Sequence, residues 1–175
     1  MSVSPKDLVL AQIDHRETDP IPYTIGFEGD VPERLDVYYG SADWRDLIEN
    51  AILHVPSPSL GVGEAKDDYY TDLYGTTWRV DCRPFHLEEP ALKDPSLAGY
   101  TFPDVDTMLA QNWDREAALR FIEQHPDRFL VVKFGFGLFE RTWALRGFDG
   151  ALMDAAAEVE FYEALVERVA QHQLD

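Results

Sequence analysis

The stretch from Phe129 to Gly147 constrains the fold more than any other part of the sequence, because it contains a strand, a turn and a helix in succession. Residues 129–132 are apolar and partly β-branched, which is typical of a strand buried on both faces of a parallel sheet. Glycines follow at positions 135 and 137, and residues 138–146 predict a helix that ends at Gly147. Strand, turn and helix form half of a βαβ unit, so this stretch predicts an α/β fold.

Helices and strands alternate along the rest of the chain. Ser4 is the expected N-cap of the first helix, with Pro5 in its first turn, and a proline-rich sequence beginning at Asp19 ends that helix. We expect Asp106 to cap a later helix, and Asp149-Gly150 to turn the chain before a long C-terminal helix. In chain order, we predict helices at 5–19, 30–39, 42–50, 107–111 and 138–146, and strands at 21–27, 51–55 and 129–132. Residues 113–124 are expected to continue the helix at 107–111 or to start a new one.

Residues 66–92 differ in character from these alternating elements. They are rich in Tyr, Thr, Trp and Val, and segments 76–80 and 85–87 have the pattern of the two arms of a hairpin. A hairpin of this size cannot hold a core of its own. We therefore predict one domain over residues 1–175, with a helical N-terminus at 1–19 and an antiparallel insertion at about 66–92.

Composition excludes several classes of protein. The 175 residues include 33 Asp and Glu against 15 Lys and Arg, a net charge of -18 that repels a phosphate backbone, so we expect no nucleic-acid partner. Apolar runs are too short for a bilayer span, and the N-terminus lacks the pattern of a secretion signal, so we expect a cytoplasmic protein with no membrane partner. The single cysteine excludes an internal disulfide.

The number of parallel strands is small for a complete α/β fold. We predict three of them, whereas a closed (β/α)8 barrel has eight and roughly 250 residues. A sheet of three parallel strands leaves an open edge. The sequence therefore predicts the N-terminal part of a (β/α)8 TIM-type barrel, with a small antiparallel hairpin insertion.

Several short motifs together resemble the uroporphyrinogen decarboxylase superfamily, which includes corrinoid-dependent methyltransferases. They occur in the order found in that family and cover nearly the whole chain. The resemblance implies a (β/α)8 barrel of about twice this length, of which this chain is the N-terminal half. The motifs are Asp19-Pro20-Ile21-Pro22, Leu73-Tyr74-Gly75-Thr76-Thr77-Trp78, Tyr100-Thr101-Phe102-Pro103-Asp104, Leu138-Phe139-Glu140-Arg141 and Arg146-Gly147-Phe148.

The resemblance favours the methyltransferase branch over the decarboxylases. Decarboxylases bind tetrapyrrole carboxylates with arginines after the first strand, whereas residues 26–31 here contain none. In those enzymes a Ser-Asp ends the second strand and a tyrosine stands four residues before a glycine, but here Ser57 precedes proline and Trp143 takes the tyrosine position. The methyltransferase branch implies zinc and a corrinoid bound with the C-terminal half, and no cofactor within this chain.

Candidate site residues lie where parallel strands end, since chemistry in barrels takes place at that rim. Lys133, Glu140 and Arg141 are the catalytic candidates there, although Glu140 equally suits a helix N-terminus and Lys133 equally suits an ion pair. The substrate-binding candidates, from their position or the resemblance, are Glu28, Asp30, Ser57, Phe136 and Trp143.

Two further groups of residues have a functional and a structural interpretation. Tyr69, Tyr70, Tyr74 and Trp78 are candidates for an aromatic substrate wall, but such residues more often pack within a hairpin. The pair Cys82 and His86 has too few neighbours of ligand type for zinc, so no metal site is predicted within the chain.

Three functions remain open. The first is the N-terminal portion of a corrinoid-dependent methyltransferase, inactive alone, with a missing C-terminal half-barrel as its partner and a small molecule or methyl carrier as its substrate. The second is a stand-alone half-barrel, a binding or structural subunit that forms a homo-oligomer through its exposed sheet edge. The third is a uroporphyrinogen decarboxylase.

Overall fold

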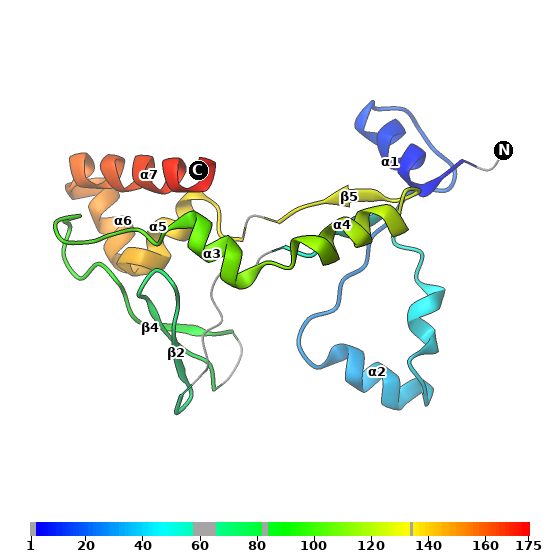
Figure 1. Cartoon of the computed structure of the whole chain (residues 1–175), viewed down its shortest axis with the longest axis horizontal. Coiled ribbons are helices and arrows are strands. Elements are labelled where there is room, and N and C mark those ends of the chain that lie inside the picture. The colour runs from blue at the N-terminus through cyan, green and yellow to red at the C-terminus, as the bar shows by residue number, and fades with distance from the viewer. Residues whose placement is uncertain (1–2, 58–65, 82–83, 134) are drawn as a thin grey trace. The chain divides into compact units, whose positions relative to one another are not determined.

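The computed structural model describes residues 3–57, 66–81, 84–133 and 135–175. Helices and short strands are mixed along the chain, as expected for an α/β protein (Figure 1). Contacts gather the chain into two compact units. Unit 1 comprises Met1–Ser57 and Arg115–Lys133, and unit 2 comprises Pro58–Asp114 and Phe134–Asp175. Within the described ranges, none of the helices has the length and apolar character needed to cross a bilayer.

Unit 1 is built around a pair of parallel strands. β1 and β5 pair in parallel, with Leu53 opposite Leu130. Helix α1 packs against both strands and begins as predicted, because the Ser4 hydroxyl accepts from the Asp7 amide while the Asp7 carboxylate accepts from Ser4. The elements of this unit are α1 (Pro5–Ile13), α2 (Val31–Tyr39), the 3-10 helix η1 (Asp43–Leu47), β1 (Ile52–His54), α4 (Arg115–Gln124) and β5 (Phe129–Val131).

The strand predicted over residues 21–27 does not form. The segment runs beside β1, but only the Ala51 amide donates to a backbone oxygen there, that of Tyr23. Side chains make the other hydrogen bonds that a strand pair would make through its backbone. The Thr24 hydroxyl bonds to the N–H and the C=O of Ile52, and the Asn50 side-chain amide bonds to the N–H and the C=O of Ile25. Since side chains supply these bonds, the described residues contain two parallel strands where three were predicted.

The expectation that β5 is buried on both faces is also wrong. Its three residues are only half-buried, and Val132 directly after them is 57% exposed. The reason is that, within the described residues, β5 pairs with β1 alone. The helix predicted over 42–50 shortens to the single turn η1, which buries Trp44.

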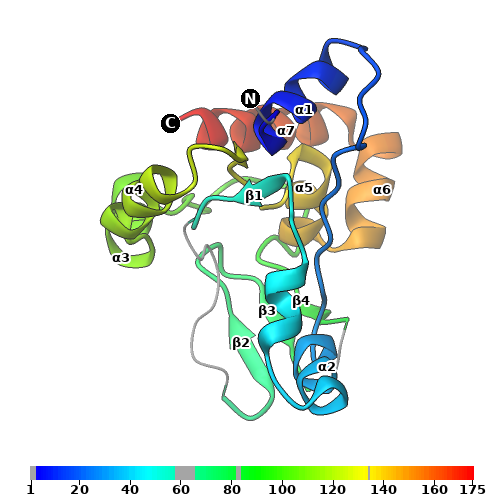
Figure 2. The same ribbon diagram turned by 90° about the vertical axis from the view of Figure 1, so that its right-hand side faces the viewer.

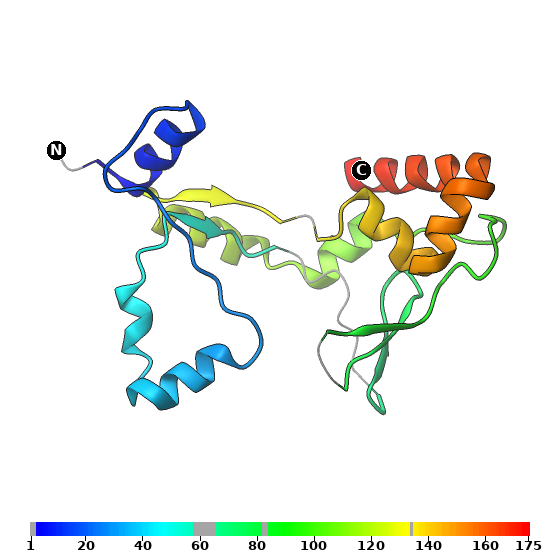
Figure 3. The same ribbon diagram turned by 180° about the vertical axis from the view of Figure 1, so that it is seen from behind.

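Unit 2 contains a three-stranded antiparallel sheet with helices beside it (Figures 1 and 3). The predicted hairpin is confirmed as β3 and β4, and β2 adds a third strand that the sequence analysis did not anticipate. Figure 2 shows the three strands side by side in the order β2-β3-β4. The elements are β2 (Tyr69–Thr71), β3 (Thr77–Arg79), β4 (His86–Glu89), α3 (Val105–Asn112), α5 (Leu138–Arg146), α6 (Phe148–Ala157) and α7 (Val159–Leu174).

Two predictions of helix boundaries in unit 2 need correction. Asp104, not Asp106, caps α3, because its carboxylate accepts from the Thr107 amide at 2.9 Å. The predicted turn at Asp149-Gly150 lies inside α6, and the C-terminal stretch forms two helices that meet at Glu158. The end of α5 at Gly147 is confirmed, with a positive φ of 82° that suits glycine.

The core of unit 2 lies between α7, α5 and the segment that follows β4. Leu145, Leu165 and Val169 are fully buried there, which confirms part of the apolar stripe predicted for the last helix. Val159, at the start of that stripe, is 48% exposed. The buried residues of this core are Tyr74, Leu92, Met108, Leu145, Leu165 and Val169.

We predict that Leu165→Ala destabilises unit 2 by about 2–5 kcal/mol, because it leaves a cavity in a closely packed core. Urea denaturation followed by circular dichroism measures this change in the free energy of unfolding. Leu174→Ala, in the same helix but 82% exposed, is the control and should change it by less than about 0.5 kcal/mol. Equal effects of the two substitutions would contradict the described core.

Candidate functional site

A buried carboxylate organises the turn between β2 and β3. Oδ1 of Asp72 accepts from the amides of Tyr74 and Thr76 at 3.0 and 2.9 Å, and Oδ2 accepts from the Trp78 indole at 3.0 Å. Gly75 lies between them with φ of 86°, a conformation that glycine adopts without strain. An aspartate that accepts from amides two and four residues ahead is a common way to fix a tight turn.

Arg141, a catalytic candidate from the sequence, lies against this carboxylate. Its Nη1 is 3.9 Å from Oδ2 of Asp72, and the two side chains are 9% and 6% exposed. The guanidinium lies 3.8 Å from the ring centroid of Tyr74 and 5.2 Å from that of Phe136. Since a buried charge needs a counter-charge, Arg141 and Asp72 hold each other in place between aromatic faces.

Aromatic side chains complete this group. The ring centroids of Trp78 and Trp143 are 6.0 Å apart, and Phe136 lies 6.1 Å from the first and 5.5 Å from the second. The structure therefore brings together three residues that the sequence singled out separately: Phe136, Arg141 and Trp143. We call the following six residues the Arg141 cluster: Asp72, Tyr74, Trp78, Phe136, Arg141 and Trp143.

Glu140, the other catalytic candidate of unit 2, has a local partner. Its carboxylate accepts from the Gly137 amide at 3.0 Å, which is the half of a capping box that the N3 side chain supplies, since glycine has no side chain for the other half. The negative charge also complements the positive end of the helix dipole. Glu140 is exposed, and this contact fits the role at a helix N-terminus that the sequence also allowed.

The remaining candidates lie in unit 1 and are exposed. Glu28 and Asp30 precede α2, and Asp30 occupies its N-cap position without a side-chain hydrogen bond. Ser57 follows β1 by three residues, and Lys133 follows β5 by two. The parallel register of the strands puts these two positions after the same ends of neighbouring strands.

Tyr74, Tyr100 and His172 form a polar chain from the Arg141 cluster to α7, which no sequence motif indicated. Nε2 of His172 lies 3.2 Å from the Tyr74 hydroxyl, and the Tyr100 hydroxyl donates to the Tyr74 carbonyl at 2.8 Å. Burial lowers the pKa of His172, and the charges of Arg141 and Arg168 lower it further while Asp175 raises it. Burial also raises the pKa of Tyr74 and of Tyr100.

No cation site is found among the residues that the structure describes. No three His, Asp or Glu side chains within those ranges converge as metal ligands would. Cys82 lies outside the described residues, and His86 begins β4 with an exposed side chain. Of the four aromatic residues considered for a substrate wall, Tyr74 and Trp78 are buried in the Arg141 cluster, so these two pack in the interior.

Four residues of the Arg141 cluster are buried, and only Phe136 and Trp143 are half-buried. A guanidinium held in this way orients the Tyr74 and Phe136 rings and does not exchange protons near neutral pH. Comparisons with protein-family models, with curated proteins and with solved structures found no match for this chain. Its chemistry therefore has to be argued from its own residues.

We predict that Asp72→Asn destabilises unit 2 by about 3 kcal/mol, because it leaves Arg141 buried without a counter-charge. An amide also has only one acceptor oxygen for the three N–H groups that Asp72 now satisfies. Urea denaturation followed by tryptophan fluorescence measures the loss. Asp68→Asn is the matched control, since Asp68 is exposed and asparagine tolerates its φ of 67°. A loss as small as that of the control would show that the ion pair contributes little.

The lowered pKa of His172 predicts that the free energy of unfolding depends on pH. Its pKa is lower in the folded protein than the ordinary 6.5, so the unfolded chain takes up a proton first as the pH falls. The stabilising contribution is therefore complete above pH 6.5 and decreases as the pH falls through the folded pKa. We expect the difference in unfolding free energy between the native chain and His172→Gln to shrink from pH 7.5 to pH 5. A constant difference over that range would exclude the lowered pKa.

Proposed function

We propose that this chain is the N-terminal portion of a barrel enzyme of the uroporphyrinogen decarboxylase superfamily, most like a corrinoid-dependent methyltransferase acting in the cytoplasm. The observation that supports the proposal most is the parallel pairing of β1 with β5. Parallel neighbours require a crossover connection, and here the connection contains helices α3 and α4 after the antiparallel strands β2, β3 and β4. A parallel pair joined through helices is the repeating element of a (β/α)8 barrel.

The partial burial of β5 agrees with this proposal. Strands of a barrel are covered on both faces and paired on both edges. β5 has one paired edge within the described residues, and Val132 is 57% exposed. Further strands that pair beside β5 would bury these groups, and we propose that the C-terminal half-barrel supplies them.

Local charge favours methyl transfer over tetrapyrrole decarboxylation. Glu28 and Asp30 are exposed carboxylates in the loop where the decarboxylases carry arginines. Trp143 lies half-buried between Trp78 and Phe136 and has no hydroxyl at the position where the resemblance implies tyrosine. Substrate carboxylates need guanidinium or ammonium donors, which this acidic loop lacks.

The proposal assigns the reaction rim to residues after the parallel strands. Lys133 is the clearest candidate, because it is exposed just after β5 and would attract an anionic group of the substrate or carrier. Zinc and the corrinoid would bind with the C-terminal half, and no step of the chemistry is assigned to residues of this chain beyond orientation and charge.

The test is to express the chain alone and with the coding sequence that follows Asp175. The longer protein should bind about one zinc per chain and demethylate methylcobalamin with a thiol, followed by the cobalamin absorbance, and the 175-residue chain should do neither. In the longer protein, Lys133→Gln should lower the rate about tenfold, whereas Lys6→Gln, exposed in the same unit, should not. A longer protein without zinc or methyl transfer would contradict the proposal, and saturable uroporphyrin binding would favour the decarboxylase.

The half-barrel that dimerises through its sheet edge remains the second candidate, because β5 has an edge unpaired within the described residues. Its distinguishing outcome is a dimer in size-exclusion chromatography, with slow hydrogen exchange at residues 129–133. A monomer with fast exchange there fits the fragment, and a monomer with slow exchange contradicts both candidates.

A further inference from the structure

Helix α6 carries an apolar face that is exposed in the part of the chain that the structure describes. Only two of its ten residues are charged, and one of them, Asp154, is buried. Phe148, Leu152 and Met153 are 53%, 47% and 67% exposed. The outer side of a surface helix usually carries polar residues, so this face is unusual for one that meets only water. Its exposed apolar residues are Phe148, Leu152, Met153, Ala155, Ala156 and Ala157.

Helix α5 extends this face beside α6. The ring centroid of Phe139, which is 47% exposed, lies 6.4 Å from that of Phe148, and the half-buried Trp143 lies 6.2 Å from Phe148. Figure 3 shows α5 and α6 next to each other, and the two helices pack together. Contiguous exposed apolar side chains usually mark an interaction site. We call the following residues the α6 face: Phe139, Phe148, Asp149, Leu152, Met153 and Ala156.

The opposite side of α6 is held in place, so the helix cannot turn to bury this face. Ala151 and Asp154 are buried, and Nε of Arg146 donates to Oδ2 of Asp154 at 2.7 Å. Nη1 of Arg146 also donates to the Lys93 carbonyl at 2.9 Å, in the segment that follows β4. Rotation of α6 would leave a buried charge unpaired, which is costly. The packing of unit 2 therefore keeps the α6 face outward.

The spacing of the α6 face suits a second helix. Residues four apart form rows along a helix, and side chains of another helix pack into the grooves between such rows. The bulky side chains lie in the first turns of α6 and alanines in the last, where a partner helix can approach more closely. Ten residues give about three turns, so one short amphipathic helix covers the face. The two rows are Phe148-Leu152-Ala156 and Asp149-Met153-Ala157.

The exposed charges at this face are negative. Asp149 is the exposed charge of α6, and Glu158 and Glu160, which follow Ala157, are exposed as well. Lysine or arginine side chains beside the apolar stripe of a partner helix would pair with these carboxylates. A second copy of this chain would bring the same carboxylates instead, since an antiparallel pair of α6 helices places Asp149 of one copy beside Glu158 of the other. Charge therefore disfavours self-association through this face.

The cations of the same part of the chain are already engaged. Residues 135–175 contain three arginines and no lysine. Arg141 and Arg146 pair with buried carboxylates of unit 2, and the Arg168 guanidinium carbon lies 5.4 Å from the centroid of the Phe102 ring. An acidic partner would thus meet repulsion at the α6 face without gaining an ion pair.

We propose that the α6 face is a docking site for a cationic amphipathic helix of a partner protein. The apolar stripe of that helix packs between the two rows of α6 and against Phe139, and its lysines or arginines lie beside Asp149 and Glu158. The site belongs to unit 2 alone, and it does not rest on the function proposed above.

A labelled peptide titrated with the full chain tests the proposal by fluorescence anisotropy. The probe consists of leucine and lysine at the spacing of an amphipathic helix, over about 18 residues so that a helix can form. We expect saturable binding with a dissociation constant on the order of 10 μM at about 0.1 M salt. A peptide with the same residues in scrambled order, and one with glutamate in place of lysine, should each bind at least tenfold more weakly.

Variants of exposed residues connect the binding to this face. Leu152→Gln combined with Met153→Gln removes two apolar side chains, keeps good helix formers and should weaken binding at least tenfold. Val37→Gln combined with Leu174→Gln is the matched control at positions 84% and 82% exposed, and it should leave binding unchanged. Asp149→Asn should weaken binding severalfold. Far-ultraviolet circular dichroism and urea denaturation check that each variant is folded.

Three outcomes would each overturn the proposal. The first is equal binding by the Leu152→Gln, Met153→Gln chain and its control. The second is equal binding of the scrambled or the glutamate peptide, which would mean that neither the stripe nor the charge is recognised. The third is a native chain that is dimeric in size-exclusion chromatography and becomes monomeric in the Leu152→Gln, Met153→Gln variant, because a second copy would then occupy the face.

Discussion

The buried carboxylate of Asp72 is the contact on which unit 2 depends. It joins three levels of structure at once: the turn after β2 through the Tyr74 and Thr76 amides, the sheet through the Trp78 indole, and α5 through Arg141. The same turn has a second contact with α5, in which the Thr76 hydroxyl donates to the Ala144 carbonyl at 2.9 Å. Because a buried charge is costly without its donors, these contacts hold the β2–β3 turn against α5.

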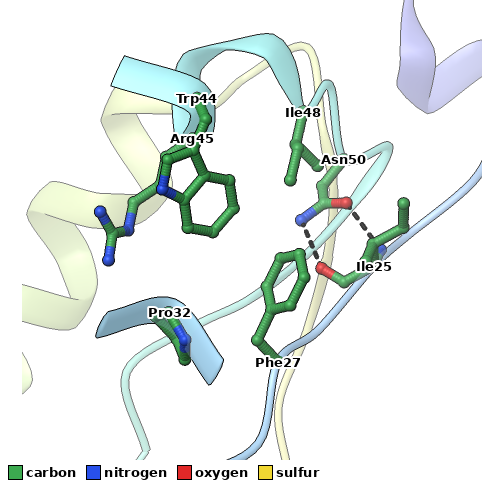
Figure 4. Close-up of a pocket in the computed structure, with 7 residues that line it drawn as sticks. All are labelled: Ile25, Phe27, Pro32, Trp44, Arg45, Ile48 and Asn50. Atoms are coloured by element: carbon green, nitrogen blue, oxygen red, sulfur yellow. Dashed lines mark hydrogen bonds between the residues drawn. The ribbon is translucent and has the colours of Figure 1, made fainter. Parts of the chain in front are cut away.

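Unit 1 is held together by side chains that replace backbone ladders. Thr24 and Asn50 bond to backbone groups that a third strand would otherwise pair. This explains two features at once. The parallel sheet stays narrow within the described residues, and the segment that leaves it brings Phe27 edge-to-face onto Trp44 (Figure 4).

Local signals allowed much of this fold to be predicted, and long-range contacts account for what was missed. The cap at Ser4, the glycine ends of α2 and α5 and the β3–β4 hairpin follow from residues close in sequence. The failed strand at 21–27 depended on side chains of a distant segment, and the burial of Arg141 depended on Asp72, which is remote in sequence. Periodicity carries no information on such pairs. The family resemblance stays a prediction.

Three arginines, one in unit 1 and two in unit 2, are each already paired with a carboxylate. Arg45, Arg141 and Arg146 each face a carboxylate of their own unit, those of Asp36, Asp72 and Asp154. Two of them also lie over aromatic rings, so their geometry serves to orient Trp44 and Tyr74. A guanidinium already neutralised binds a second carboxylate weakly, because the first must be displaced or repelled. These three guanidiniums are therefore not the free cations that a polycarboxylate substrate would require.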